Sequence, residues 1–340
     1  GFSTVTWKGE GGSRYVGGVG FSPSLNWIKR LNGNGSNRIT DVVRGAGEDW
    51  MSDDTGVEAT GNNCSAFHPD GFTNGGNSDD SGDTYVAWNW DMGSSNATNT
   101  TGSTNSTVRA NPTYGQSIVS YTGASGAQTI GHGLSSAPEV IIVKNRDVTN
   151  ESRVYHASLP AGGSYNAEQY SLRLDSSGGE ADSTYWNDTA PTSSVFTVGD
   201  SQVVNSGHGN DYIAYCWHSV AGYSKCNRYS GDGSTDGSNT VNCGFEPAFL
   251  MIKCTNDAES WWVFDNARNP FGSGTQRRVA WSSAGGEITN VSTSADNLEF
   301  TSTGFKLTGS GGGTNGSGNT YVYMAFADKR EYAYWLDQSG

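Results

Sequence analysis

Charged residues are scarce in this sequence, and basic residues are the scarcest of them. Only 16% of the 340 residues are charged, and 20 Lys and Arg stand against 34 Asp and Glu, which gives a net charge of −14. Nucleic-acid affinity depends on basic side chains that neutralise phosphates, and the sequence contains no local basic patch that would offset its acidity. We therefore expect no nucleic-acid partner.

Long apolar runs and cysteines are also few. The sequence has no run of about 18 apolar residues, so we expect no membrane insertion, and it has no charged start followed by an apolar stretch that would indicate a signal peptide. The cysteines show no CxxC or Cys/His spacing of the kind that zinc sites have. We interpret them as buried free thiols, with a bridge between the last two as the alternative. The cysteines are Cys64, Cys216, Cys226, Cys243 and Cys254.

Glycine, in contrast, is abundant, with 48 residues in the chain. Glycine and asparagine supply the positive φ angles that tight turns between short strands need, so the composition favours an all-β protein. The length suffices for two or three domains that each bury a core. The chain starts with Gly1 and not with Met, and we expect a processed product or a fragment.

A turn followed by an aromatic strand occurs three times. The three copies are "SGDTYVAWNW" at 81–90, "GNDYIAYCW" at 209–217 and "SGNTYVYMAF" at 317–326. Bulky residues alternate along the first copy, which is typical of a strand on an aromatic core. We predict that the fourth residue of each copy, counted from Tyr85, Tyr212 and Tyr321, is buried and equivalent in the three copies; these residues are Trp88, Tyr215 and Met324.

A second repeated feature is an apolar strand that ends in lysine, at Lys29, Lys144 and Lys253. The residue twelve positions further on is Asp41, His156 and Asp265, respectively. The second and third copies have a pitch of 109 residues. These repeats predict three tandem related β-sandwich domains, jelly-roll or concanavalin-like, at residues 1–92, 114–222 and 223–330. We interpret 93–113 as a flexible polar linker or surface tether and 331–340 as a C-terminal tail.

Several longer blocks resemble one known family. The blocks are "GVGFSPSLNWIK", "STVRANPTYGQSIVSYTG", "STYWNDTAPTSSVFTVG" and "CGFEPAFLMIK". They are similar to repeat-containing proteins of marine tailed bacteriophages that are described as tail-fibre-like or virion-associated. The resemblance covers nearly the whole chain and implies a place on the exterior of a virion. It supplies no catalytic residues.

Catalytic and metal-binding patterns are incomplete. Glu180 and Asp182 have strand spacing, as a glycosidase pair would have, but the third carboxylate of laminarinase-type sites would fall at Tyr185. We interpret this segment as a solvated loop. The five histidines show no HxH or HExxH spacing, and Asp79, Asp80 and Asp83 do not fit an EF-hand. We expect no catalytic residue, no metal and no cofactor.

Tryptophan gives the candidates for ligand binding, because an exposed indole ring can stack on a sugar. Trp261 and Trp262 are adjacent, so a strand would turn one ring inward and the other outward. Trp186 and Trp335 are similar candidates, although a core or intersubunit role is the more common one for such rings.

These observations favour a non-enzymatic structural protein of a bacteriophage particle, such as a fibre, tail appendage or capsid decoration. We expect it to contact copies of itself, other virion proteins and host surface polysaccharide. A carbohydrate-active depolymerase and a secreted bacterial lectin are the alternatives. A convergent carboxylate pair in a groove would favour the first alternative, and secretion into the culture medium would favour the second.

Overall fold

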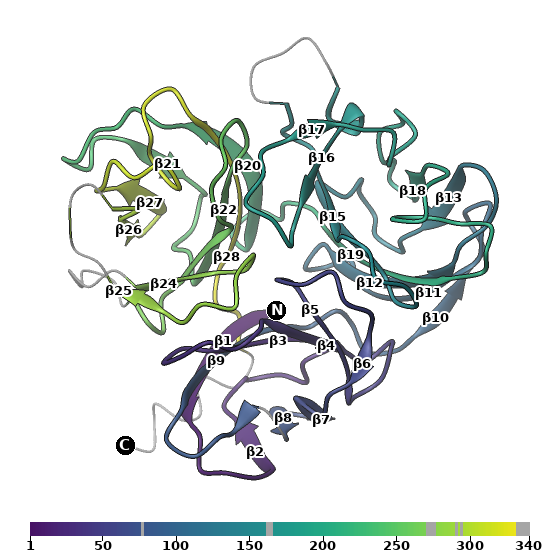
Figure 1. Cartoon of the computed structure of the whole chain (residues 1–340), viewed down its shortest axis with the longest axis horizontal. Helices are drawn as coiled ribbons and strands as arrows, with labels where there is room; N and C mark the ends of the chain where they lie inside the picture. The colour runs from purple at the N-terminus through teal and green to yellow at the C-terminus, as the bar shows by residue number, and fades with distance from the viewer. Residues whose placement is uncertain (76–77, 161–165, 270–276, 290–291, 293–294, 331–340) are drawn as a thin grey trace.

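Three β-sheet modules make up the chain and lie around a common centre (Figure 1). The computed structural model describes residues 1–75, 78–160, 166–269, 277–289, 292 and 295–330. Module 1 contains β1 to β9, module 2 contains β10 to β19, and module 3 contains β20 to β28. In each module a large antiparallel sheet faces the centre and a small sheet lies on the outside. The fold is thus all-β, as the composition predicts.

Module 1 has a large sheet in the order β1-β9-β3-β4-β5-β6 and a small sheet in the order β2-β8-β7. The chain enters and leaves the large sheet through tight turns, such as the Ser81–Gly82 turn before β9, where Gly82 has a φ of 91°. The strands of module 1 are β1 (Phe2–Lys8), β2 (Arg14–Gly17), β3 (Leu25–Arg30), β4 (Arg38–Asp41), β5 (Glu48–Met51), β6 (Ala59–Thr60), β7 (Cys64–His68), β8 (Gly71–Asn74) and β9 (Thr84–Trp90).

Module 2 repeats this arrangement and adds two strands to one edge. Its large sheet has the order β10-β11-β12-β19-β14-β15-β16-β17, and its small sheet pairs β13 with β18. A 3-10 helix, η2 (Ala167–Gln169), precedes β16. The strands are β10 (Ala97–Asn99), β11 (Ser106–Asn111), β12 (Gln116–Thr122), β13 (Gln128–Gly131), β14 (Val140–Asn145), β15 (Arg153–His156), β16 (Tyr170–Arg173), β17 (Ala181–Asp182), β18 (Val195–Val198) and β19 (Asp211–Trp217).

Module 3 has a large sheet in the order β20-β28-β22-β23-β24-β25 and a small sheet in the order β21-β27-β26. The six strands match those of module 1 one for one, and they match β12-β19-β14-β15-β16-β17 of module 2. The strands are β20 (Ser224–Ser230), β21 (Thr240–Asn242), β22 (Phe249–Cys254), β23 (Trp262–Asp265), β24 (Arg277–Ala280), β25 (Ile288–Thr289), β26 (Leu298–Thr301), β27 (Gly304–Leu307) and β28 (Thr320–Phe326).

The segment 93–113 differs from the expected flexible linker. Strand β11 pairs along its full length with β12, and β10 pairs with β11. Val108 on β11 is buried, and the Arg109 Nε donates to the carbonyl of Gly93 at 2.7 Å. A strand can pair with the exposed edge of a sheet through its backbone and needs few apolar side chains to do so. The polarity of a segment therefore does not distinguish an edge hairpin from a linker.

The last strand of each module lies inside its large sheet and is buried on both faces. These strands are β9, β19 and β28. In β9, Tyr85 and Ala87 pack in the core between the two sheets of module 1, whereas Val86, Trp88 and Trp90 point to the centre of the molecule. Strand β28 divides its side chains in the same way. We call β9, β19 and β28 the closing strands and count their residues from Tyr85, Tyr212 and Tyr321, respectively. The apolar cluster that the three modules share is called the central core.

The end of the described chain returns to module 1. The amide of Lys329 donates to the carbonyl of Phe2 at 2.9 Å, and the Arg330 guanidinium donates to the carbonyl of Thr4 at 2.8 Å. Module 3 is therefore bound to β1, and the three modules form a closed ring instead of a row.

Candidate functional site

The central core is the place where side chains from all three modules meet. Trp27 of module 1 stacks on Trp281 of module 3 with 3.4 Å between the ring centroids. Trp90 of module 1 lies 6.1 Å from Trp217 of module 2. Each of these four rings is at most 1% exposed. Aromatic side chains bury large areas, so these contacts stabilise the arrangement of the modules as well as the modules themselves.

Polar contacts in the central core involve the repeated position twelve residues after each lysine. Asp41 of module 1 accepts a hydrogen bond from the hydroxyl of Tyr215 in module 2 at 2.7 Å. Asp265 of module 3 accepts one from the indole N–H of Trp88 in module 1 at 3.0 Å. In each case the donor is the fourth residue of a closing strand. The spacing found in the sequence thus positions a contact between modules.

The third of these contacts has a different chemistry. His156 of module 2 faces β28 of module 3, where the fourth residue is Met324 and offers no polar hydrogen. The Nε2 of His156 lies 3.2 Å from the carbonyl oxygen of Tyr323, and its Nδ1 accepts from the amide of Ser158. These partners require the proton on Nε2. Burial lowers the pKa of His156 to about 4, so the ring is neutral near pH 7.

An arginine accompanies each aspartate but not the histidine. The Nε of Arg44 lies 2.5 Å from Asp41, and the Nε of Arg268 lies 2.7 Å from Asp265. The side chains of Asp41 and Arg44 are fully buried. Burial opposes the charge of Arg44, but Asp41 and the other acidic groups around it raise its pKa above the usual value. Module 2 carries Leu159 in place of this arginine, which suits a neutral imidazole.

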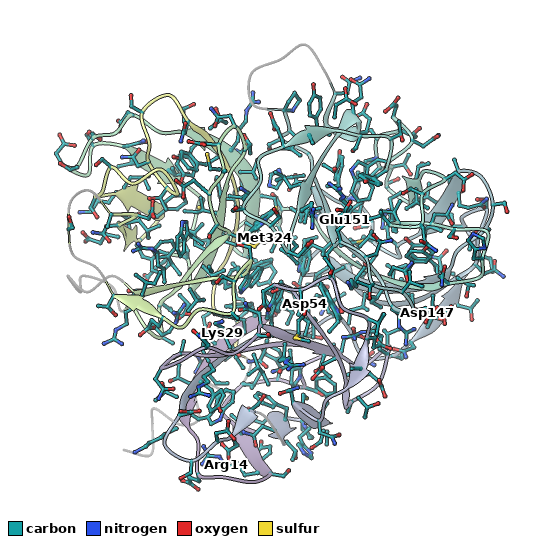
Figure 2. The ribbon with its side chains drawn as sticks, viewed as in Figure 1. Arg14, Lys29, Asp54, Asp147, Glu151 and Met324 are labelled. Carbon is teal, nitrogen blue, oxygen red and sulfur yellow. The ribbon has the colours of Figure 1, made fainter. Side chains whose placement is uncertain are left out.

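The three repeated lysines also bind neighbouring modules. Their side chains are fully buried, and each Nζ donates to the carbonyl six residues ahead in its own module, at 2.6 to 2.7 Å. Each Nζ also donates to a loop of the next module. Lys29 reaches Ser283, Lys144 reaches Thr55 and Lys253 reaches Ser177, at 2.9 to 3.2 Å. Figure 2 shows Lys29 at the border of modules 1 and 3.

Among the described residues, no carboxylate is a hydrogen-bond partner of these lysines, although Asp and Glu residues lie near enough to raise their pKa values. Burial is the larger effect and lowers the pKa of each lysine to about 8. A buried ammonium that donates to main-chain carbonyls is a structural contact, because both acceptors belong to the fold. These lysines are therefore interface residues.

The pair Glu180 and Asp182 lies at the junction between modules 2 and 3, near the contact of Lys253 with Ser177. The amide of Glu180 donates to the carbonyl of Thr255 in module 3 at 2.6 Å. Glu58 and Glu287 take this position in the other modules, and their amides donate to Arg146 and Leu31 of the neighbouring module. The side chain of Asp182 is exposed on the two-residue strand β17. The shared position favours a role of Glu180 in the junction.

The tryptophan candidates are less accessible than the sequence suggested. Trp186, Trp261 and Trp262 are 1%, 2% and 9% exposed. Strand alternation does separate the adjacent pair, since Trp261 points to the central core and Trp262 to the core of module 3. The expectation that one ring faces solvent is wrong because both faces of the large sheet are covered. Trp335 lies outside the described residues.

The remaining candidates have structural surroundings. All five cysteines are buried and free, so Cys243 and Cys254 form no disulfide. Burial raises the pKa of the Cys243 thiol to about 12, and a protonated thiol is a poor nucleophile. Asp79 and Asp83 pair with Arg14 and Arg30. Over the described part of the chain, no group of three or more His, Cys, Asp or Glu side chains could hold a metal ion.

Trp88, Tyr215 and Met324 are equivalent and buried, as predicted, with exposures of 0%, 1% and 1%. What sequence reasoning missed is that these residues contact the neighbouring module and not the core of their own. The sequence contains a signal, because the two aspartates face donors, Tyr215 and Trp88, whereas the histidine faces the closing strand that has Met324 at this position. An alignment of the repeats, however, places equivalent residues side by side, whereas each contact joins two residues that are not equivalent.

The fold and these contacts define a ring of three β-sandwich modules with polar junctions. The chain belongs to the family described as Domain of unknown function (DUF7483), which it matches over residues 1–330. A comparison with curated proteins gives no match. Within the described residues, no helix is long and apolar enough to cross a membrane.

Proposed function

We propose that this chain is a non-enzymatic structural protein of a bacteriophage particle, displayed on the virion exterior, where it contacts copies of itself and other virion proteins and binds host surface glycans. The observation that carries the proposal is the use of the repeated polar residues. Asp41, His156, Asp265 and the three repeated lysines all bind one module to another. The residues that would be the first candidates for chemistry instead hold a rigid block together.

The closed ring changes how such a protein would act on a particle. Three modules in a row would add reach and separate weak binding surfaces, whereas three modules around one core give a compact block. A fibre or appendage would then arise from contacts between blocks. A specific contact needs about 1,000 Å² of buried surface. The large apolar residues exposed in the described structure are Tyr15, Val57 and Ile288, so such a contact would be mainly polar.

The resemblance of the sequence blocks to tailed-phage proteins gives the proposal its biological context. Protein mass spectrometry of purified particles, combined with imaging of the intact particle, tests it. We expect several copies of the chain on the outside of the particle. Absence from purified particles would contradict the virion role, and recovery from the culture medium alone would favour the lectin.

A reducing-sugar assay on capsular and cell-surface polysaccharides tests the non-enzymatic part. We expect no release of reducing ends by the wild-type chain. Activity that is lost in Glu180→Gln or Asp182→Asn, with an unchanged melting temperature, would replace this proposal by the depolymerase.

A further inference from the structure

A polar pocket opens at one end of module 2, between two connections of the chain. The first connection joins β12 to β13 over residues 123–127, and the second joins β18 to β19 over residues 199–210. The volume of the pocket is about 400 Å³, within the range of about 300–1,000 Å³ that small-molecule sites have. Its lining consists of polar side chains and one glycine, so a ligand in this pocket is bound mainly through hydrogen bonds.

Two buried side chains of the lining hold the walls of the pocket in place. The Oδ1 of Asn205 accepts from the amide of Ala124 at 2.9 Å, and its Nδ2 donates to the carbonyl of Gly126 at 2.7 Å. The hydroxyl of Ser206 accepts from the amide of His208 at 3.2 Å. Asn205 thus binds the second connection to the first, and the backbone around the pocket is fixed by contacts of the fold.

Four other side chains of the lining are exposed and are not used by the fold. Within the described part of the chain, none of the four makes a hydrogen bond or an ion pair through its side chain. They offer a hydroxyl, a carboxylate, an amide and an imidazole, so the pocket presents both donors and acceptors of hydrogen bonds. These residues are Ser125, Asp200, Gln202 and His208.

The same end of module 3 is closed by its own chain. Its first connection covers residues 231–239 and is longer than that of module 2. Asn315 is buried there and accepts from the amide of Asp232 at 3.1 Å, which is the contact that the buried asparagine makes in module 2. Asn315 also donates to the carbonyl of Ser234 and accepts from the side chain of Asn239, both at 2.8 Å. The longer connection therefore folds over the position that stays open in module 2.

A charged pair takes the corresponding place in module 1. Asp79 stands there in the place of Asn315, and its carbonyl accepts from the amide of Gly11 in the first connection at 2.7 Å. The Nε of Arg14 lies 3.2 Å from the carboxylate of Asp79, and its Nη1 lies 3.1 Å from Glu10. Modules 1 and 3 thus occupy this end with their own side chains, whereas module 2 leaves its polar groups accessible to a ligand.

We propose that the pocket of module 2 binds a neutral saccharide. Two neighbouring hydroxyls of one sugar ring donate to the carboxylate of Asp200, and other oxygens of the ring accept from Ser125 and His208. A carboxylate has two acceptor oxygens, and its charge makes each hydrogen bond stronger. The lining contains one carboxylate and no Lys or Arg, in a chain whose net charge is −14, which disfavours an acidic sugar. The inference deepens the proposed binding of host surface glycans and rests on it.

Asp200→Asn is the sharpest variant, because it keeps the shape of the side chain and removes the charge. Gly207→Ala narrows the pocket, since the new Cβ would lie 2.2 Å from the Oγ of Ser125 and the serine side chain has to turn. Asp188→Asn, at an exposed aspartate of the same module, is the matched control. Its φ of 46° is one that asparagine also adopts. Thermal melting of each variant separates lost binding from lost folding.

Binding is measured by saturation-transfer NMR and titration calorimetry of the whole chain. The probes are the methyl glycosides of glucose, galactose and mannose, the deoxy analogues of the sugar that binds, and methyl glucuronide as the acidic counterpart. We expect a neutral glycoside to bind, and Asp200→Asn to weaken its binding by roughly tenfold or more, because hydrogen bonds to a charged acceptor are lost. Removal of one of the two neighbouring hydroxyls should also weaken binding. Gly207→Ala should weaken it, and Asp188→Asn should leave it unchanged.

Three results overturn the inference. Binding of a neutral glycoside that is unchanged in Asp200→Asn would place the sugar elsewhere, and the proposed glycan binding would stand without this pocket. If no neutral glycoside binds to a chain that is nevertheless found on particles, the pocket is no saccharide site, while the virion role is retained. Tighter binding of the glucuronide than of the glucoside would contradict the argument from charge. Should Gly207→Ala fail to fold, Asp200→Asn decides the matter alone.

Discussion

Modules 1 and 2 have different side chains twelve residues after the repeated lysine, Asp41 and His156. The difference matches the residue that each side chain meets in the neighbouring module. Asp41 meets the hydroxyl of Tyr215 and carries a buried arginine with it, whereas His156 meets a closing strand whose fourth residue is Met324. A carboxylate facing methionine would have no donor in the partner module, and a buried unpaired charge is costly. The neutral imidazole donates to a main-chain carbonyl instead. At each junction the Asp or His and the strand that it meets are therefore complementary.

The largest loss of stability should come from the junction between modules 1 and 2, where Asp41 and Arg44 are buried and charged. Asp41→Ala leaves the buried Arg44 without its nearest carboxylate, and we expect the free energy of unfolding to fall by about 3–5 kcal/mol. Urea denaturation measures this loss. The double variant Asp41→Leu/Arg44→Met should recover most of it, because paired apolar replacements remove the uncompensated charge. A loss under about 1 kcal/mol in the single variant would show that Asp41 is not a required contact.

Truncation of a closing strand should be nearly as severe. Trp88→Ala opens a cavity between modules 1 and 3 and removes a hydrogen bond to Asp265, so we expect a cost of about 3–5 kcal/mol. Trp88→Phe keeps most of the volume and isolates the loss of the hydrogen bond, for which about 1–3 kcal/mol is expected. Unchanged melting of Trp88→Ala would contradict the burial of this ring in the central core.

The junction between modules 2 and 3, which contains the neutral His156, should lose stability in acid. The pKa of His156 is about 4 in the folded chain, against 6.5 for the imidazole of an unfolded chain. The unfolded chain therefore binds more protons than the folded chain between pH 4 and pH 6.5. Stability is complete above pH 6.5 and decreases as the pH falls toward 4, by about 3 kcal/mol.

His156→Gln keeps a side-chain donor for the carbonyl of Tyr323 but does not titrate. It should flatten the dependence of stability on pH between 6.5 and 4, measured by urea denaturation at several pH values. His208→Gln, at an exposed residue, is the control. Burial lowers the pKa of His132 as well, so part of the slope should remain. An unchanged slope in His156→Gln would show that this imidazole is not buried in its neutral form.

The smallest effect at neutral pH should come from the repeated lysines. Lys144→Met removes two hydrogen bonds to carbonyls but also the cost of burying an ammonium group, so we expect a change within about 1–2 kcal/mol at pH 7. Each folded pKa is about 8 against 10.5 unfolded. Unfolding between pH 8 and 10.5 should therefore take up protons, and these lysines should make stability rise with pH.

Calorimetry in buffers of different ionisation enthalpy measures this proton uptake. The uptake should become smaller in Lys144→Met, whereas Lys306→Met, at a partly exposed lysine paired with Glu299, should leave it unchanged. Proton release in place of uptake would contradict the lowered pKa of the buried lysines.

Much of the fold could be predicted from the sequence because the repeats carry it. The alternation around Trp88 and the shared spacing between lysine and Asp or His identified equivalent strands in the three modules. The arrangement of the modules could not be predicted, because a strand buried on both faces looks the same whether the second face meets a sheet of its own module or another module. The same ambiguity made Trp261 and Trp262 seem candidates for an exposed ring.

The surface groove between modules 1 and 3, which Thr6, Lys8, Arg277 and Glu287 help to line, could not be predicted either. Its residues come from β1 and β24, which are about 270 positions apart in the chain, and only the ring brings them together.

Closure of the ring is the central claim, and scanning calorimetry of the whole chain tests it most directly. Because the modules share one aromatic core and buried polar contacts, we predict a single transition in which the calorimetric and van 't Hoff enthalpies agree. Two or three separate transitions, one for each module, would show that the modules fold independently and would contradict this account.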